Sequence, residues 1–313
     1  MGTGGSILTL AVPGGFDLPR AVCSYGYFIL APNRWDTDRR VLFRPLCGCD
    51  ERLVQVVISQ HRSGRLRIAC DRRVDRQEAD SLRQQATRMF RLDEDFRSWH
   101  RVHPAARRQG FGRLFRSPTL FEDMVKTITT CNVTWPNTMH MNTLLCRHVG
   151  GGGFPTPRQL AKVRVDTLKR RCKVGYRARS IVGLARRVAR GELDLKLFED
   201  RDRSTDDVFR QLLLVHGIGP YGAANLCQLL GRYDRVAIDT ETYRHFRQQH
   251  GVATPVNPKK LHRRIEAHYA RYAPYQFLAY WFELWCAYEK HAGDARNWDA
   301  QQHGPEFTAA KLK

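Results

Sequence analysis

Long apolar runs are missing from this sequence, and none of its apolar stretches approaches the roughly 20 residues that a membrane-spanning helix needs. The first residues also lack the basic and then apolar order of a secretory signal. These absences argue against a membrane protein, and a hydrophobic content of 42% is typical of a soluble globular one. We expect an intracellular protein, in the cytoplasm and nucleoid or in a nucleus.

Acidic residues are scarce: 31 Asp and Glu stand against 52 Lys and Arg, which gives a formal net charge of +21. An excess of this size favours a polyanionic partner, most often nucleic acid. A second interpretation stays open, in which the many arginines only keep the surface soluble.

Closely grouped cysteines are also absent near the C-terminus, so no set of four is placed there for an iron–sulfur cluster. The nine cysteines are scattered, and an odd count in an intracellular chain is not a disulfide framework. Cys47, Cys49, His61 and Cys70 can be combined as zinc ligands, but their spacing fits no common zinc finger. We therefore expect no metal site.

Alternation of strands with helices is missing, and no repeat recurs at a fixed period. After a Gly-rich stretch that we expect to be frayed up to about residue 15, short β-like runs follow at 21–30, 40–43, 53–59 and 66–69. Residues 76–96 have helical spacing, 103–112 form a basic connector, and many short helical patterns follow. We predict an α+β fold, with an antiparallel sheet domain at 1–100, a two-part helical body at 112–290 and a tail at 291–313.

The most informative stretch runs from Ser204, a natural N-cap, to Phe246. An apolar helical pattern, which Leu213 and Leu214 widen, ends at two glycines before Pro220 opens the next helix. Such a turn directs free backbone N–H groups and a helix N-terminus outward, where they can hold a phosphate. The predicted phosphate-binding hairpin consists of His216, Gly217, Ile218, Gly219, Tyr221 and Gly222.

The hairpin segment 214–220, followed by residues 236–239, resembles the hairpin-plus-aspartate module of the helix-hairpin-helix (HhH-GPD) DNA glycosylase superfamily, which excises damaged bases. Residues 121–132 resemble an early core helix of that superfamily and the loop after it. Residues 175–179 resemble a segment of the 8-oxoguanine glycosylases. The resemblance covers 112–290 in order, and the sheet is similar in kind to that of the 8-oxoguanine and 3-methyladenine branches.

This resemblance implies an enzyme of base excision repair that acts as a monomer on double-stranded DNA containing a damaged base. It implies no cofactor, although the hairpin carbonyls of relatives can hold a monovalent cation. A binder of damaged DNA without catalysis, an 8-oxoguanine-type enzyme with lyase activity and an RNA-binding protein remain as alternatives.

Asp239 is the catalytic acid that the resemblance implies. Breaking an N-glycosidic bond builds positive charge on the sugar, and a fixed carboxylate stabilises that charge and orients or deprotonates a water. Asp239 equally suits an N-cap for a helix that begins at Thr240, and one residue can do both. Glu241 is a nearby competitor that we expect to face solvent.

A lysine is missing from the hairpin and its second helix. Lyase-active members carry one two residues after the second hairpin glycine, where its amine forms a Schiff base, and this sequence has Tyr221 there. Monofunctional 3-methyladenine members have an aromatic residue at that place. The sequence therefore predicts a monofunctional glycosylase, which uses water and leaves an abasic site.

The resemblance implies roles for five further residues. Tyr176 is a wedge against the opened base stack, Arg177 reaches toward the unpaired partner base, and Asn132 fills the vacated space. Tyr280 and Trp281, with Tyr221, are candidates to line the base pocket. An aromatic stripe at this spacing is equally typical of a helix core, which Phe277 and Trp285 would then share.

Overall fold

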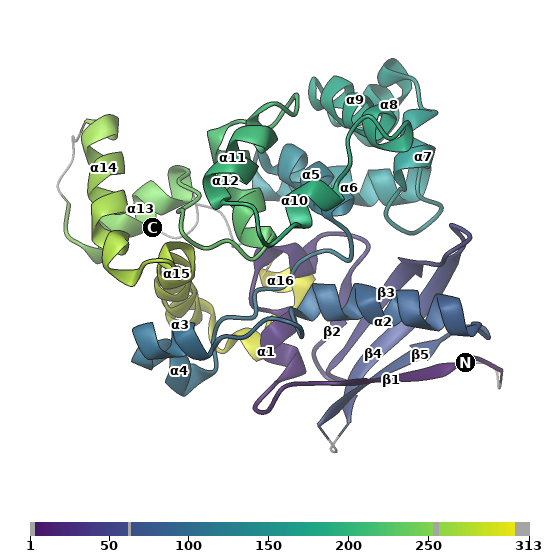
Figure 1. Cartoon of the computed structure of the whole chain (residues 1–313), viewed down its shortest axis with the longest axis horizontal. Coiled ribbons are helices and arrows are strands. Elements are labelled where there is room, and N and C mark those ends of the chain that lie inside the picture. The colour runs from purple at the N-terminus through teal and green to yellow at the C-terminus, as the bar shows by residue number, and fades with distance from the viewer. Residues whose placement is uncertain (1–3, 62–63, 253–256, 304–313) are drawn as a thin grey trace.

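The computed structural model describes residues 4–61, 64–252 and 257–303. It confirms the α+β class: a five-stranded antiparallel sheet is formed early in the chain, and helices make up the remainder (Figure 1). None of the described helices is long and apolar enough to cross a membrane.

The sheet has the strand order β1-β5-β4-β3-β2. Its strands are β1 (Ile7–Ala11), β2 (Arg34–Asp36), β3 (Val41–Cys47), β4 (Leu53–His61) and β5 (Arg65–Cys70). Alternate residues such as Leu42, Ile58 and Ile68 lie opposite one another in register and are fully buried. Helix α2 (Arg76–Phe90) runs along the sheet and supplies a matching apolar face (Figure 1).

Two expectations for the first 30 residues are wrong. Residues 21–30 form no strand but belong to helix α1 (Leu18–Val22) and the 3₁₀ turn η1 (Gly26–Ile29), because their side chains are buried on all sides without alternation. The stretch expected to be frayed contains β1, which pairs with β5. Strand pairing between segments so far apart leaves little trace in local spacing.

The helical body begins with two short helices, α3 (Arg97–Val102) and α4 (Pro104–Gln109), and α4 lies where we predicted a connector without helical structure. Trp99 and Ala106 anchor them in the core. The other helices follow in order: α5 (Leu120–Thr130), α6 (Trp135–His148), α7 (Pro157–Ala161), α8 (Val165–Cys172), α9 (Arg177–Ala189), α10 (Lys196–Glu199), α11 (Thr205–Leu213), α12 (Pro220–Leu229), α13 (Thr240–Gln249), α14 (Pro258–Tyr269), η2 (Ala270–Tyr272) and α15 (Gln276–Ala292).

The last described residues return to the sheet domain. The short elements η3 (Ala295–Asn297) and α16 (Ala300–His303) pack against α1 and η1 (Figure 1). Trp298 between them is fully buried, and its ring centroid lies 4.6 Å from that of Trp285. The predicted tail therefore begins with packed residues, and its part from 304 onward lies outside the described residues. The domain boundaries themselves stay a prediction.

Candidate active site

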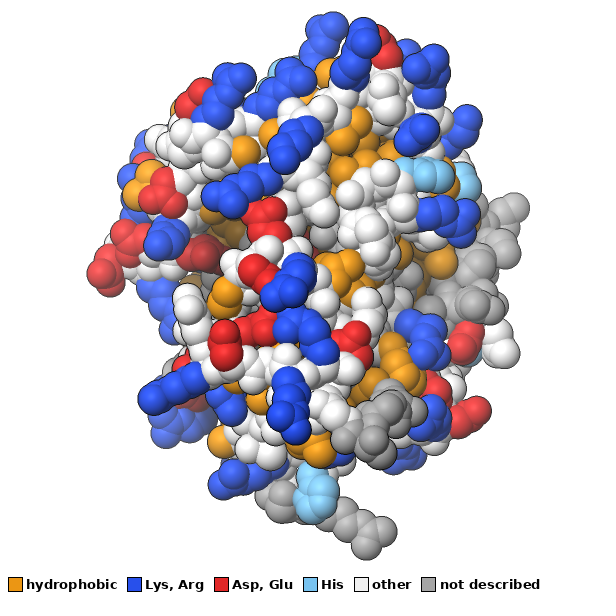
Figure 2. Space-filling view, turned by 90° about the vertical axis from the view of Figure 1, so that its right-hand side faces the viewer, with side chains coloured by type: hydrophobic (Ala, Val, Ile, Leu, Met, Phe, Trp, Pro, Cys, Tyr) orange, Lys and Arg blue, Asp and Glu red, His pale blue; other side chains and the backbone are white. Residues whose placement is uncertain are grey.

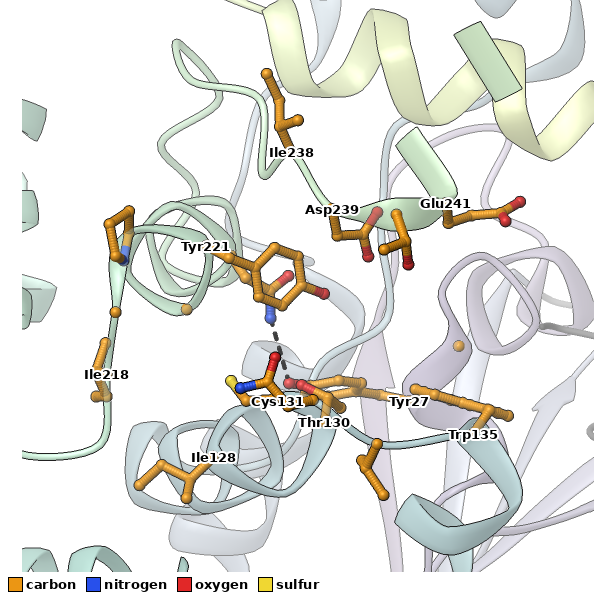
Figure 3. A pocket seen from close by; sticks show the side chains of 18 of the residues that line it. Tyr27, Ile128, Thr130, Cys131, Trp135, Ile218, Tyr221, Ile238, Asp239 and Glu241 are labelled. Atoms are coloured by element: carbon orange, nitrogen blue, oxygen red, sulfur yellow. Dashed lines mark hydrogen bonds between the residues drawn. The ribbon is translucent and has the colours of Figure 1, made fainter. Parts of the chain in front are cut away.

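A cavity of about 1010 Å³ opens where η1, the loop after α5, the hairpin, α13 and α15 meet (Figure 3). Every predicted site residue except His216 lines it. The cavity therefore brings together predicted site residues that are up to about 150 positions apart in the sequence, from Asn132 to Trp281.

Asp239 caps helix α13 and also faces the cavity. Its Oδ1 accepts hydrogen bonds from the backbone N–H and the hydroxyl of Thr242, both at 2.9 Å. No side chain in the described parts of the chain donates to Oδ2, although the backbone N–H of Glu241 lies near the carboxylate, and Figure 3 shows the carboxylate beside the ring of Tyr221. Burial raises the pKa of Asp239 above the ordinary aspartate value, although the bonds from Thr242 oppose that rise. Asp239 therefore caps α13 with one carboxylate oxygen, as predicted, and presents the other oxygen to the cavity.

Glu241 does not face solvent, so that expectation is wrong. Its side chain is only 15% exposed, and its carboxylate accepts hydrogen bonds from Arg244 and, at 2.9 Å, from the hydroxyl of Tyr288. It lines the cavity but is directed away from Asp239 (Figure 3). Because Arg244 neutralises Glu241, Asp239 is the better placed acid.

The hairpin connects α11 to α12 as predicted. The backbone N–H groups of Gly217, Gly219, Tyr221 and Gly222 meet no acceptor among the described residues. Together with the N-terminus of α12, they form the kind of site that holds a phosphate. The expectation that Leu213 and Leu214 widen the apolar face is wrong: α11 ends there, and the two side chains are 38% and 71% exposed.

The hairpin packs tightly against α9. Gly217 has a φ of +92°, and a Cβ atom there would lie 2.5 Å from the Cβ of Ser180. The exposed His216 does not line the cavity, but its Nδ1 lies 3.0 Å from the Ser180 hydroxyl. A side chain at position 217 would therefore displace the hairpin from α9.

The predicted aromatic residues lie in the cavity wall. Tyr221 projects from the start of α12 toward Asp239 (Figure 3). Tyr280 is buried, with its hydroxyl 2.9 Å from the Thr242 hydroxyl. The indole of Trp281 donates to the Ser24 carbonyl at 2.9 Å, whereas Phe277 on the same helix is core.

Sequence reasoning missed the contribution of the sheet domain to this wall. Tyr25 and Tyr27 of the η1 region line the cavity, and the Tyr25 hydroxyl donates to Asn225 of α12 at 2.6 Å. Asn225 and Gln228 are buried polar residues in a mostly apolar helix, and this was the signal that polar partners were needed. Further missed lining residues are Trp135, Tyr243 and Tyr288.

The three residues predicted to enter the DNA lie together on the rim. Tyr176 is 67% exposed, and Asn132 is exposed with a left-handed φ of +51°. Arg177 is buried between them: it donates to the carbonyls of Asn132, at 3.1 Å, and Cys131, and lies 4.6 Å from the Tyr176 ring centroid. Arg177 thus links the loop after α5 to the start of α9. Its contact with a partner base stays a prediction.

Basic side chains crowd the region beside the rim. Figure 2 shows Lys and Arg side chains over the top of one face, where α7–α9 lie in Figure 1. The exposed basic residues of this region are Arg158, Lys162, Arg164, Lys169, Arg170, Arg171, Lys173, Arg179, Arg186 and Arg190. Their position suits a long polyanion that also reaches the hairpin.

One group of side chains has the spacing of metal ligands in the described parts of the chain: His250, His268 and Glu283. Glu283 Oε1 already lies 2.9 Å from His245 Nε2, 3.2 Å from His250 Nε2 and 2.8 Å from the Tyr269 hydroxyl. The group is therefore a hydrogen-bonded junction of α13, α14 and α15. Cys47, Cys49, His61 and Cys70 form no comparable group.

Comparison with known proteins gives a match in structure but not in sequence. No family model and no curated protein sequence matches the chain. MBOgg1, solved with a low-affinity DNA ligand, is 18% identical with a TM-score of 0.66, over 94% of this chain and 98% of that one. The 3-methyladenine DNA glycosylase of Archaeoglobus fulgidus is 16% identical with a TM-score of 0.69, over 89% and 98%.

A third similar structure is the 8-oxoguanine glycosylase/lyase of Clostridium acetobutylicum in its apo form. It is 17% identical with a TM-score of 0.58, over 82% of this chain and 93% of that one. All three similarities extend over the sheet domain and the helical body. The chain therefore has the fold of the DNA glycosylases, as its helix-hairpin-helix motif predicts.

Proposed function

We propose that the protein is a monofunctional DNA glycosylase, which turns a damaged base out of duplex DNA, hydrolyses its N-glycosidic bond and leaves an abasic site. The observation that carries the proposal is the placement of Asp239. Its free Oδ2 lies in a cavity that the phosphate-binding hairpin also lines. The glycosylase fold of the chain supports the same function.

The proposed mechanism uses only groups of this chain. The free N–H groups of the hairpin hold a backbone phosphate without regard to sequence. The base leaves the stack at a cost of a few kcal/mol, and Tyr176 and Asn132 occupy the opened space. A water adds to C1′ of the sugar while the C1′–N bond breaks and its electron pair leaves with the base. Asp239 stabilises the positive sugar and accepts the water's proton.

The absence of an amine nucleophile supports hydrolysis over lyase chemistry. None of the described residues that line the cavity is a lysine, and Tyr221 occupies the place of the Schiff-base lysine. The proposal needs no cofactor, and a monovalent cation at the hairpin carbonyls would serve only to shape the phosphate site. We propose that the protein acts as a monomer.

Borohydride is expected to trap no covalent adduct between the protein and a lesion-containing duplex, because no Schiff base forms. The measurement is denaturing gel electrophoresis after incubation with labelled DNA and borohydride, with a glycosylase/lyase as the positive control. Alkali treatment of a parallel sample should reveal abasic sites. A trapped adduct would contradict the hydrolytic mechanism and favour the lyase alternative.

We propose that the preferred base is positively charged, as N-alkylated purines are. Electron-rich rings dominate the wall, Asp239 adds a negative charge, and Arg177 is the sole Lys or Arg among the described lining residues. A cation held against aromatic faces gains roughly 0.5 to 2 kcal/mol. The lining residues with aromatic rings are Tyr25, Tyr27, Trp135, Tyr176, Tyr221, Tyr243, Tyr280, Trp281 and Tyr288.

A panel of duplexes with single lesions checks this preference. Release of a cationic alkylpurine, divided by its spontaneous release rate, should exceed that of oxidised guanine or a deaminated base by about 2- to 30-fold. Faster release of oxidised guanine would contradict the charge argument. Tight binding of every lesion without any abasic site would favour the non-catalytic binder, and a preference for single strands would favour an RNA-binding protein.

A further inference from the structure

We propose that Thr242 is a positioning residue for Asp239, and that the hydroxyl of Tyr280, as a second acceptor of the Thr242 proton, tunes that bond. This inference rests on the proposed glycosylase function. Thr242 is fully buried on the first turn of α13, one helical turn after Asp239. It is therefore placed to hold the carboxylate without contacting the DNA.

The hydroxyl of Thr242 has one proton and three oxygen atoms nearby. Asp239 Oδ1 and the Tyr280 hydroxyl both lie at 2.9 Å, and the Ala237 carbonyl lies at 3.3 Å. A carboxylate is the strongest acceptor of the three, so the proton goes to Asp239. The geometry at Tyr280 makes its hydroxyl oxygen a second acceptor for the Thr242 proton, and the backbone N–H of Asp239 donates to the Thr242 hydroxyl oxygen at 3.2 Å.

In this arrangement the two carboxylate oxygens of Asp239 have different roles. Both bonds from Thr242 end on Oδ1, which leaves Oδ2 directed at the cavity. A β-branched threonine has a stiff χ1, so its hydroxyl holds the bond at little entropic cost. Tyr280 stays protonated and neutral beside this bond, because burial and the nearby Asp239 raise its pKa well above the ordinary tyrosine value.

Thr242→Val is the direct test, because it keeps the shape and the backbone N–H but removes the hydroxyl. The expected result is a kcat lowered by about 10- to 100-fold with little change in KM. The acidic limb of the pH–rate profile should move to higher pH, since the lost hydrogen bond favoured the ionised carboxylate. Other titratable groups near Asp239 are unchanged in this variant: Glu241, Tyr25, Tyr221, Tyr243, Tyr280 and Tyr288.

Three further variants separate positioning from a general loss of structure. Thr242→Ser restores the hydroxyl and should recover most of kcat. Thr156→Val removes a capping box of the same kind at the start of α7, away from the cavity, and should lower Tm but not kcat. Tyr280→Phe leaves Thr242 in place but removes a competing acceptor for its proton, so it should move the acidic limb to lower pH by a smaller amount.

The proposal fails if Thr242→Val folds and keeps the wild-type kcat and acidic limb. If that variant does not fold, the proposal is overturned instead by a Tyr280→Phe variant whose pH–rate profile keeps its acidic limb at the wild-type pH. Failure of the glycosylase function is seen separately, because the wild-type protein would then release no lesion faster than Asp239→Asn.

Discussion

Asp239→Asn is expected to slow base release by about two to three orders of magnitude, because the positive sugar then has no negative charge beside it. The amide oxygen of asparagine still accepts the backbone N–H of Thr242, and asparagine caps helices as well as aspartate does. Single-turnover release of a labelled lesion, followed by alkali cleavage, measures the rate.

The same substitution should leave the protein as stable as the wild type, or more so. Burial raises the pKa of Asp239 in the fold, so the protonated form is the favoured one. Stability from such a group is present below the unfolded pKa of about 3.9 and is lost as the pH rises through the folded value. At neutral pH the charged form is therefore a net cost, which asparagine removes. A large fall in Tm would show that Asp239 is mainly structural, and unchanged activity would place catalysis elsewhere.

Gly217→Ala is expected to destabilise the fold by about 2 to 5 kcal/mol and to abolish productive DNA binding. A left-handed backbone costs alanine roughly 1 to 2 kcal/mol, and a close contact in a packed site adds about 1 to 3. The new Cβ would lie 2.5 Å from the Ser180 Cβ, so the hairpin must move and its N–H groups lose their alignment. Denaturant unfolding and binding of an abasic duplex measure the two effects.

Gly183→Ala is the matched control. Gly183 lies on α9 near Ser180, it is exposed, and a Cβ there would meet nothing within 4 Å. The same substitution should be neutral, or stabilising by up to about 1 kcal/mol, because alanine favours a helix. The double variant Ser180→Gly with Gly217→Ala removes the clash but not the backbone strain, so it should recover only part of the loss. Equal stability of Gly217→Ala and Gly183→Ala would refute the steric explanation.

The hairpin and its aspartate were predictable because their determinants are local. Gly217 and Pro220 mark the turn, and Asp239 starts a helix in the structure as its neighbours predict. The other half of the cavity depends on contacts between distant segments. Tyr25 reaches Asn225 across 200 positions, and no spacing within either segment indicates that bond.

Glu241 shows why the sequence pattern within one helix does not predict which of its side chains are buried. Within its own helix it looks like a solvent-facing first-turn acid, and Arg244 on the next turn agrees with that. Its burial comes from Tyr288, which lies 47 residues later on α15. Trp298 is a similar case, since a tail without motifs still supplies one of the largest fully buried side chains. Burial of this kind is a property of the assembled core.

Helix α13 is tied to α15 at both of its ends. Near its start, Thr242 contacts Tyr280, and near its end His245 and His250 contact Glu283. These contacts hold the acid and the Tyr280–Trp281 wall in one fixed arrangement. The hairpin is formed by α11 and α12 instead. The contacts that shape the phosphate site and those that set the distance from acid to wall are therefore made by different helices, so substitutions can alter one without altering the other.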